Sequence, residues 1–439
     1  MNLKAGKQKL GIWMTTSLVI GNMIGGGIFL MPSALAEYGG ISILGWLVSS
    51  VGALLLALVF SKLSRLVTGK SGGPYAYARA GFGDYVGFLV AWGYWIAVWV
   101  AMAALAIAFV SAMSIFFPIL KEKPWIAVSL GLGTLWFLTW INSRGIRASG
   151  RLQVLTTLLK IIPILLIILG GFFFFEPDNF IPFNASDDSA ISAIAITGTL
   201  TLYAFLGLES ASVPSDNVKE PEKTIPRATM LGTVFTTALY ILSTVAIMGL
   251  IPLDTLATSP APFADAMKIM TGETGSYIVA GGVAMSAFGA LNGWILIQSQ
   301  VARAISRDGL FPGIFKRENN KGTPVWGLVI GSLLASILML MNYSEGLVDQ
   351  FKFVILLSTI CTLVPYLFAV ASFVGISLEK QLQGKQRIRV YILGGLAFAF
   401  SIWAVYGAGE KAVFLGFILL MLGTPFYVWL KWKQKTRID

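Results

Sequence analysis

Residues 21–30 read GNMIGGGIFL, and the three consecutive glycines in this apolar stretch, Gly25, Gly26 and Gly27, decide how the chain is interpreted. Each glycine in a helix interior costs about 1 kcal/mol relative to alanine, so three in a row predict a break in the helix. A break frees backbone amides and lets a ligand approach the main chain closely. The alternative is that the glycines only allow close helix packing, as small residues do in membrane proteins.

The composition around this motif is that of an all-α integral membrane protein. Of 439 residues, 56% are hydrophobic and only 12% are charged. We expect one transport domain over residues 10–432 with cytoplasmic tails at 1–9 and 433–439. Apolar stretches of about 20 residues, which suffice to cross a bilayer, predict twelve spans at about 12–34, 41–61, 86–117, 124–142, 153–175, 190–212, 228–251, 275–302, 325–342, 353–376, 390–408 and 412–430.

The distribution of basic residues explains the net charge of +11 by topology, not by a nucleic-acid partner. Most of the 32 Lys and Arg lie in the tails and in one set of alternate loops. The exceptions are Lys160 inside a span and, in the opposite loops, Lys121, Lys123, Lys268, Lys352 and Lys411. Because cytoplasmic loops carry the excess of Lys and Arg, we expect both termini on the cytoplasmic side of the cell's inner membrane.

A second glycine-interrupted stretch, Phe205-Leu206-Gly207-Leu208-Glu209-Ser210, lies five spans after the first. Paired interrupted helices in two halves of a chain point to a transporter binding site. A unit of five helices has an odd number of crossings, so its second copy must run with opposite topology. We therefore expect a 5+5 inverted repeat, with spans 11 and 12 outside it in a peripheral or dimer-contact role.

The two predicted breaks offer complementary chemistry. Amides near Gly26 and Gly27, at the positive end of the following half-helix, suit a carboxylate. Carbonyl groups freed around Leu206, Gly207 and Leu208 can accept hydrogen bonds from an ammonium group. This pairing favours an α-amino acid, whereas an amine or polyamine would use half of it.

Four runs resemble the amino acid–polyamine–organocation superfamily: GNMIGGGIFLMPSALAEYGG (21–40), SGGPYAYARAGFG (71–83), AFLGLESASV (204–213) and GTPVWGL (322–328). They are most similar to its basic amino acid/polyamine antiporters of the arginine/agmatine exchanger type. The resemblance implies a LeuT-like fold with discontinuous helices 1 and 6, and a homodimer. It also implies exchange of an amino acid for a related amino acid or amine by alternating access, with no cofactor and no metal.

Carried onto matching positions, the resemblance implies a central substrate site. It places the carboxylate at the amides of the Gly25, Gly26 and Gly27 run, Tyr203 as an aromatic gate, and Trp294 stacked on the substrate side chain. The remaining implied contacts are the carbonyls of Met23, Tyr203 and Leu206 and the residues Ala97, Val98, Met102 and Ser358.

Three of these positions depart from the arginine/agmatine pattern. Met102 stands in place of a polar amide, Tyr203 in place of an indole, and Gly26 in place of a serine. A buried guanidinium that loses a hydrogen-bond partner is destabilised by about 1–3 kcal/mol, so a neutral amino acid stays open beside a cationic one.

Lys160 and Glu209 are the two charges deep inside predicted spans, where an ionisable residue is a functional-site candidate. Glu209 either couples transport to pH or is a structural carboxylate bonded to freed amides. Lys160 is similar to the span 5 lysine of proton-coupled amino acid transporters. It could carry the coupling proton, act as a fixed ammonium in place of a sodium ion between spans 1 and 8, or belong to a plain buried ion pair or to a span whose boundary lies elsewhere.

Other function classes fit less well. A channel would need a continuous polar pore, which mostly apolar spans do not offer. An enzyme would need an acid–base pair or nucleophile, but histidine is absent, Cys361 is the single cysteine, and Glu209 is the one acid deep in the membrane. The sequence predicts an amino acid exchanger, with a proton symporter using Lys160 as the alternative and a non-transporting sensor as a remote one.

Overall fold

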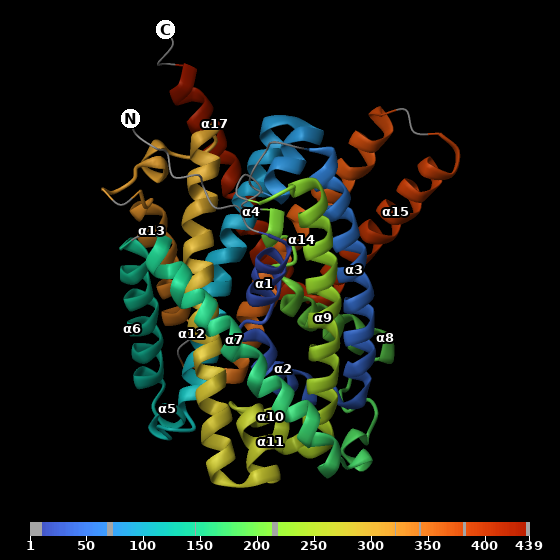
Figure 1. Cartoon of the computed structure of the whole chain (residues 1–439), viewed down its shortest axis with the longest axis vertical. Coiled ribbons are helices and arrows are strands. Elements are labelled where there is room, and N and C mark those ends of the chain that lie inside the picture. Colours follow the sequence, from blue (N-terminus) through green and yellow to red (C-terminus); the bar gives the residue numbers. More distant parts are fainter. Residues whose placement is uncertain are drawn as a thin grey trace.

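The computed structural model describes residues 11–67, 73–144, 146–212, 218–320, 322–341, 344–380 and 383–435. Over these ranges the chain is a bundle of helices without a β-sheet (Figure 1). The predicted tail at 1–9 and residues 436–439 of the other tail lie outside the described residues.

The helices follow the predicted apolar stretches closely. The long helices are α3 (Ser42–Leu66), α4 (Pro74–Met113), α6 (Pro124–Ser143), α7 (Ile146–Gly171), α9 (Pro221–Leu250), α12 (Glu273–Arg307), α13 (Val325–Met341), α14 (Leu347–Glu379) and α15 (Gly384–Gly407). Interrupted segments are α1 (Ile12–Met23) with α2 (Gly27–Ala36), α8 (Ala190–Leu202) with the 3-10 turns η4 (Tyr203–Phe205) and η5 (Ser210–Ser212), and α16 (Glu410–Met421) with α17 (Gly423–Lys435). The short elements are α5 (Ile119–Glu122), α10 (Leu253–Thr258), α11 (Pro262–Thr271), η1 (Gly39–Ile41), η2 (Phe172–Phe174), η3 (Pro177–Phe180) and η7 (Gly313–Lys316).

The outer surface of the bundle suits lipid. Ten segments in the described ranges are long and apolar enough to cross a membrane, and the stretches Leu159–Phe174 and Val325–Met341 are apolar but shorter. Large apolar side chains point outward, including Phe173, Ile191 and Tyr406, which are 86%, 75% and 67% exposed. Exposing so much apolar surface to water is unfavourable, whereas hydrocarbon accepts it.

Helix α4 is longer than the predicted span at 86–117, because it begins at Pro74. Gly83 interrupts it with φ of +79°, a left-handed conformation that glycine adopts without steric cost. A 40-residue helix would be about 60 Å long at 1.5 Å per residue, twice the hydrocarbon thickness. The stretch before Gly83 therefore extends beyond the core of the bilayer.

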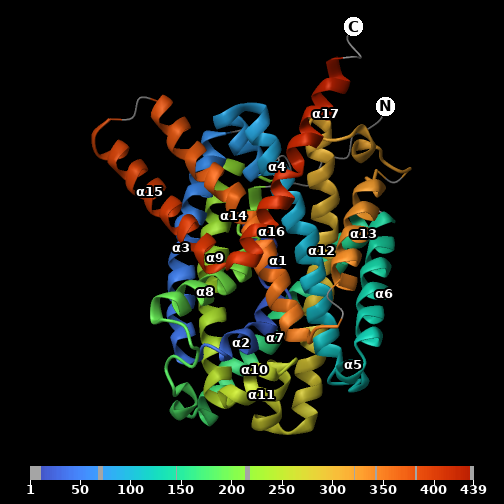
Figure 2. The same cartoon turned by 180° about the vertical axis from the view of Figure 1, so that it is seen from behind.

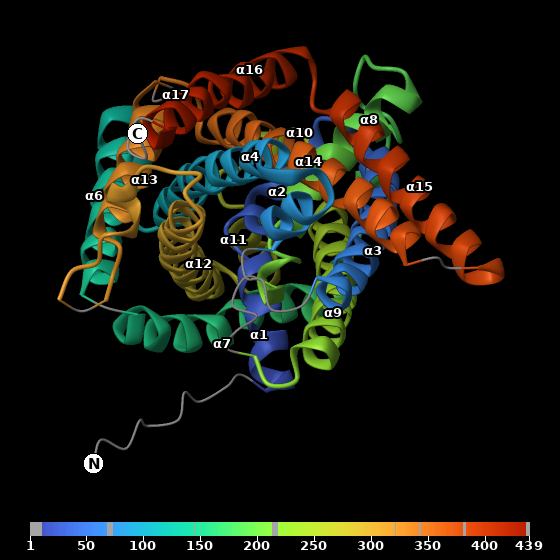
Figure 3. The same cartoon turned by 90° about the horizontal axis from the view of Figure 1, so that it is seen from above.

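In the view from above, α2 lies near the centre of the bundle, and α1 runs outward from it between α7 and α9 (Figure 3). Helix α4 packs along α12 and α14 on one side of α1 and α2, and α3 packs along α8 and α9 on the other. The last helices lie at the edge, where α15 diverges from the bundle (Figure 2). In the α16–α17 span, 22% of the most apolar window is buried, against 89% in the α4 span.

An aromatic cluster holds the second broken segment against its neighbours. The Trp46 ring of α3 lies 5.9 Å from Phe205 in η4 and 5.5 Å from Tyr240 in α9. All three side chains are fully buried. Helices α3, α8 and α9 thus pack together, and the interruption at Tyr203–Phe205 packs against them.

Candidate functional site

The first broken helix ends and restarts within four residues. Helix α1 ends at Met23, Ile24 leaves the helical region with ψ of 81°, and α2 begins at Gly27. The Gly25 N–H donates to the Met23 carbonyl at 2.8 Å. Among the described residues, no backbone carbonyl accepts from the N–H groups of Gly26 or Gly27. These amides lie at the positive end of the α2 dipole, an arrangement that binds anions.

Close packing explains why the break is made of glycine. A Cβ atom on Gly26 would lie 2.5 Å from the Ala108 Cβ of α4, and one on Gly27 would lie 2.7 Å from the Tyr203 ring. Gly25 is less crowded, with Leu105 at 3.1 Å from the added atom. Helix α4 and Tyr203 therefore press directly on the main chain of the break.

The second broken helix is interrupted after Leu202, where α8 passes into η4. Leu206 is extended, with ψ of 133°, and Gly207 has φ of +106°. A Cβ on Gly207 would also lie 3.1 Å from the Asn22 carbonyl carbon. Gly207 is therefore needed both for its conformation and for the close approach of the two breaks.

A cavity of about 20 Å³ lies between the two breaks. That space holds about one water molecule, so the two breaks are closed on each other in this structure. The positive end of α2 and the negative end of α8 both meet the cavity. Its lining residues are Asn22, Met23, Gly25, Gly27, Ala101, Leu105, Tyr203, Ala204, Leu206 and Trp294.

Glu209, just beyond the second break, is buried and fully partnered. Its Oε1 accepts from the Tyr94 hydroxyl of α4 at 2.8 Å, and its Oε2 accepts from the Tyr366 hydroxyl of α14 at 2.7 Å. The Gly207 N–H donates to Oε2 at 3.2 Å. One carboxylate thereby joins the broken segment to two helices on the opposite side of the bundle.

The two breaks also contact each other directly. The Asn22 side-chain amide donates to the Ser210 hydroxyl at 2.9 Å, and both side chains are buried. This hydrogen bond joins residues 188 positions apart in sequence. The hydrogen bond therefore ties the two broken segments to each other.

Lys160 of α7 is fully buried and reaches the first broken segment. Its Nζ donates to the Gly21 carbonyl of α1 at 2.8 Å. No carboxylate in the described part of the chain lies within 4.0 Å of this amine. The amine thus contacts the backbone one residue before Asn22, and the described residues offer it no ion pair.

Sequence comparison places the chain among known proteins. The profile of a family described as amino acid permease matches residues 10–429. The chain belongs to the amino acid permease family. Similar proteins include a putrescine transporter of Haemophilus influenzae, 34% identical over 98% of this chain and 99% of its own. An arginine/ornithine antiporter of Pseudomonas aeruginosa is 30% identical over 96% and 90%, and a cadaverine/lysine antiporter of Escherichia coli is 31% identical over 96% and 94%.

The structure brings many of the predicted site residues of this permease to one place. Six of them line the cavity between the breaks: Met23, Gly25, Gly27, Tyr203, Leu206 and Trp294. The Met23 carbonyl accepts from Gly25 and the Tyr203 carbonyl from Leu206, whereas no described backbone N–H donates to the Leu206 carbonyl.

The side-chain positions of other predicted residues of the permease do not line the cavity. Gly26 faces Ala108, and the Ser358 hydroxyl of α14 donates to the Ala97 carbonyl at 3.0 Å. Val98 and Met102 are buried in α4 but do not line the cavity.

Four lining residues of the permease were missed by the sequence reasoning, namely Asn22, Ala101, Leu105 and Ala204. Asn22 and Ala204 lie within the two quoted motifs, which are the sequence signal for them. Ala101 and Leu105 are four residues apart on α4, the spacing of one helix face. The sequence contains that face but no signal for which face of the apolar part of α4 borders the breaks.

Proposed function

We propose that this permease is a secondary carrier that exchanges amino acids or related amines across the membrane by alternating access. One observation carries the proposal: two helices break at the same cavity and present it with opposite dipole ends. Free amides at Gly26 and Gly27 suit a carboxylate, and the unpaired carbonyl of Leu206 suits an ammonium group. The named antiport activities of the relatives support exchange as the mode of transport.

The finer topology follows the same proposal. Counting α1–α2, α8–η5 and α16–α17 as one span each and adding the shorter α7 and α13 stretches gives the twelve spans predicted from sequence. The first ten form the 5+5 inverted repeat. The ends of α4, α12 and α14 that border the basic loops face the cytoplasm of the cell, as do both termini.

Two of the sequence-based roles belong to this proposal. Tyr203 lies against Gly27 and gates the cavity, and Trp294 contacts the substrate side chain. Dimer formation would use the poorly enclosed α15–α17 face, and crosslinking in nanodiscs tests it.

The test is uptake of labelled amino acids into proteoliposomes, with and without amino acid preloaded inside. We expect uptake to require internal substrate and to be unaffected by an inward proton gradient. Uptake into empty vesicles that rises with the proton gradient would replace exchange with symport. Binding without flux would make the protein a sensor.

Proton symport is the second candidate because of Lys160. Its amine is buried, lacks a carboxylate partner among the described residues, and holds the backbone of α1 near the first break. A proton leaving this amine would weaken its hold on Gly21, which would couple protonation to movement of α1.

A further inference from the structure

The charges around the cavity do not match a cationic substrate. The cavity lining contains no acidic side chain. Its side-chain acceptors are neutral, namely the amide oxygen of Asn22, whose Nδ2 donates to Ser210, and the Tyr203 hydroxyl. Glu209 follows the lining residue Leu206 by three positions, but it does not line the cavity. Tyr94, Tyr366 and Gly207 donate hydrogen bonds to its two carboxylate oxygens. A guanidinium or second ammonium at the cavity would find no carboxylate in its lining to pair with.

A basic group lies on the same segment. The Lys160 amine is hydrogen-bonded to Gly21, whose neighbour Asn22 lines the cavity. When this amine is protonated, it repels another buried cation, and the low dielectric of the interior screens that repulsion poorly. The local charge therefore disfavours the distal charge of arginine, ornithine or a diamine.

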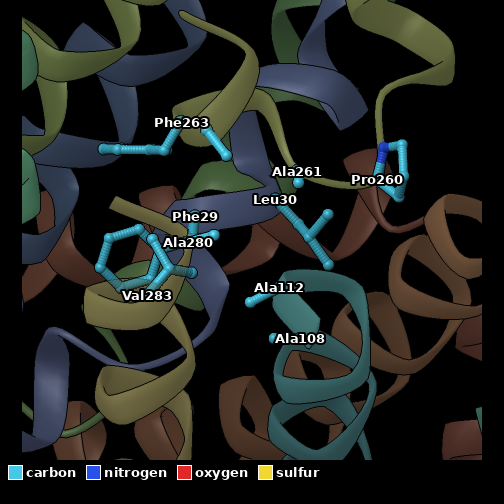
Figure 4. A pocket seen from close by; sticks show the side chains of 10 residues that line it. Phe29, Leu30, Ala108, Ala112, Pro260, Ala261, Phe263, Ala280 and Val283 are labelled. Atoms are coloured by element: carbon cyan, nitrogen blue, oxygen red, sulfur yellow. The ribbon is translucent and has the colours of Figure 1, made fainter. Parts of the chain in front are cut away.

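The α4 wall of the cavity is apolar and continues beyond it. Ala101 and Leu105 line the cavity between the breaks, and Ala108 and Ala112, at the next positions on the same helix face, line a second cavity (Figure 4). The second cavity measures about 10 Å³. Figure 4 shows Phe29, Leu30, Phe263 and Val283 closing around it from α2, α11 and α12. A side chain that extends along α4 thus meets apolar groups on both sides of Leu105.

Leu105 occupies the decisive position on this face. Its Cδ2 lies 3.1 Å from where a Cβ of Gly25 would be and 3.2 Å from where one of Gly26 would be. It therefore lies against the main chain that would hold the substrate carboxylate, and it limits the space left for the substrate side chain.

We propose that the site takes a neutral α-amino acid with an apolar side chain, and that Leu105 sets the size of that side chain. This inference rests on the proposed carrier function and gives its substrate class. It differs from the cationic compounds in the names of the similar proteins, because those compounds carry a second charge that this cavity does not neutralise.

Competition for exchange tests the substrate class. The full-length protein in proteoliposomes preloaded with leucine is given labelled leucine outside, with alanine, valine, methionine, arginine, ornithine or putrescine as competitors. We expect the neutral apolar compounds to compete at concentrations roughly tenfold or more below the cationic ones. Stronger competition by arginine, ornithine or putrescine overturns the substrate class and leaves the exchange function standing.

A result without leucine flux is also decisive. Parallel vesicles preloaded with arginine and given labelled arginine show whether the protein carries a cationic substrate instead, which contradicts the inference. If no compound is transported, the carrier function itself fails, and thermal-shift measurements with the same compounds then report which class binds. Stabilisation by arginine, ornithine or putrescine, or by none of the compounds, overturns the inference in that case.

Variants of Leu105 test its own role. The readout is the strength of competition by unlabelled phenylalanine relative to unlabelled leucine. Leu105→Ala should shift this ratio toward phenylalanine by roughly tenfold, because truncation opens space beside Gly25. Leu105→Met conserves volume and should keep the wild-type ratio. Leu89→Ala, the same truncation elsewhere on α4, controls for loss of stability. An unchanged phenylalanine-to-leucine ratio in a folded Leu105→Ala protein contradicts the assignment.

Discussion

Glu209 accepts hydrogen bonds from two tyrosines of different helices and from the backbone of its own broken segment. A buried carboxylate is tolerated when its oxygens are hydrogen-bonded. Removing one member of such a network leaves the remaining buried polar groups without a hydrogen-bond partner. At the scale of single residues, both ionisable side chains hydrogen-bond to the backbone of a broken segment, Glu209 at Gly207 and Lys160 at Gly21.

Glu209→Ala should destabilise the protein and stop exchange. It leaves the Tyr94 and Tyr366 hydroxyls without their acceptor, and each buried unsatisfied group costs about 1–3 kcal/mol. Thermal unfolding in detergent and exchange in proteoliposomes measure the two effects. Tyr366→Phe, which removes one donor and leaves the carboxylate two others, should be affected less. A Glu209→Ala protein as stable as wild type would show that the network does not hold the segment.

Lys160→Met should abolish exchange while the protein still folds. The substitution keeps an unbranched side chain of similar length but leaves the Gly21 carbonyl without its donor, so α1 loses its tie to α7. Leu165→Met, on the exposed face of α7, is the matched control and should transport normally. Comparing uptake from pH 5 to pH 8 in wild type and variant also tests coupling. A residual activity that keeps the wild-type pH profile excludes the amine as the proton carrier.

At the scale of elements, the two breaks are held by their neighbours as well as by their own sequence. Helix α4 presses on Gly26 through Ala108, and the second break approaches Asn22 through Gly207. Each of these contacts therefore depends on a glycine in the break, and in the first the partner Ala108 is small as well. The chain leaves the helical conformation between α1 and α2 and again after α8. A helix therefore ends at the cavity at each break, and its dipole faces the cavity.

Gly26→Ala should reduce exchange strongly, and Ala108→Gly in the same protein should restore it. The added methyl group would lie 2.5 Å from the Ala108 Cβ, and overpacking of this kind costs about 1–3 kcal/mol. Removing the Ala108 methyl group returns the space. Exchange rates of the two single variants and the double variant measure the coupling between the sites. If the double variant is no better than Gly26→Ala alone, the contact with α4 is not the cause.

At the scale of the whole molecule, a charged network joins α4 to the ends of α12 and α17. Arg79 contacts Asp84 at 2.9 Å and Asp308 at 3.0 Å, and Lys431 contacts Asp84 at 3.1 Å. The Tyr75 hydroxyl donates to Asp308 at 2.6 Å. The side chains of the three ion pairs are 34–41% exposed. Because exposed ion pairs are screened by solvent, each contributes about 0–1 kcal/mol to stability. Their position suggests a closing contact on the proposed cytoplasmic side.

Arg79→Gln should open this side of the carrier more often with little loss of stability. On a Cys361→Ser background, a cysteine introduced at the cavity by Ala204→Cys reports access from the cytoplasmic side through its rate of labelling by an impermeant maleimide. We expect faster labelling when Arg79 no longer bridges Asp84 and Asp308. Lys268→Gln, which breaks the pair with Glu273 at the opposite end, is the control. Equal labelling rates with and without Arg79 would exclude a closing role.

The sequence by itself determined the membrane class, the family and the positions of the two breaks. Hydropathy, three consecutive glycines and two intramembrane charges are local signals, and a single chain displays them without knowledge of its partners. Their position inside apolar stretches marks Lys160 and Glu209 as candidates independently of their contacts.

Only the tertiary structure decided which side chains meet. A helix turns about 100° per residue, so on an apolar helix such as α4 the sequence does not distinguish the face of Ala101 and Leu105 from that of Val98 and Met102. Packing against α12, α14 and the two breaks selects the face. The partners of Glu209 and Lys160 likewise come from helices distant in sequence, because long-range contacts are set by how the bundle closes.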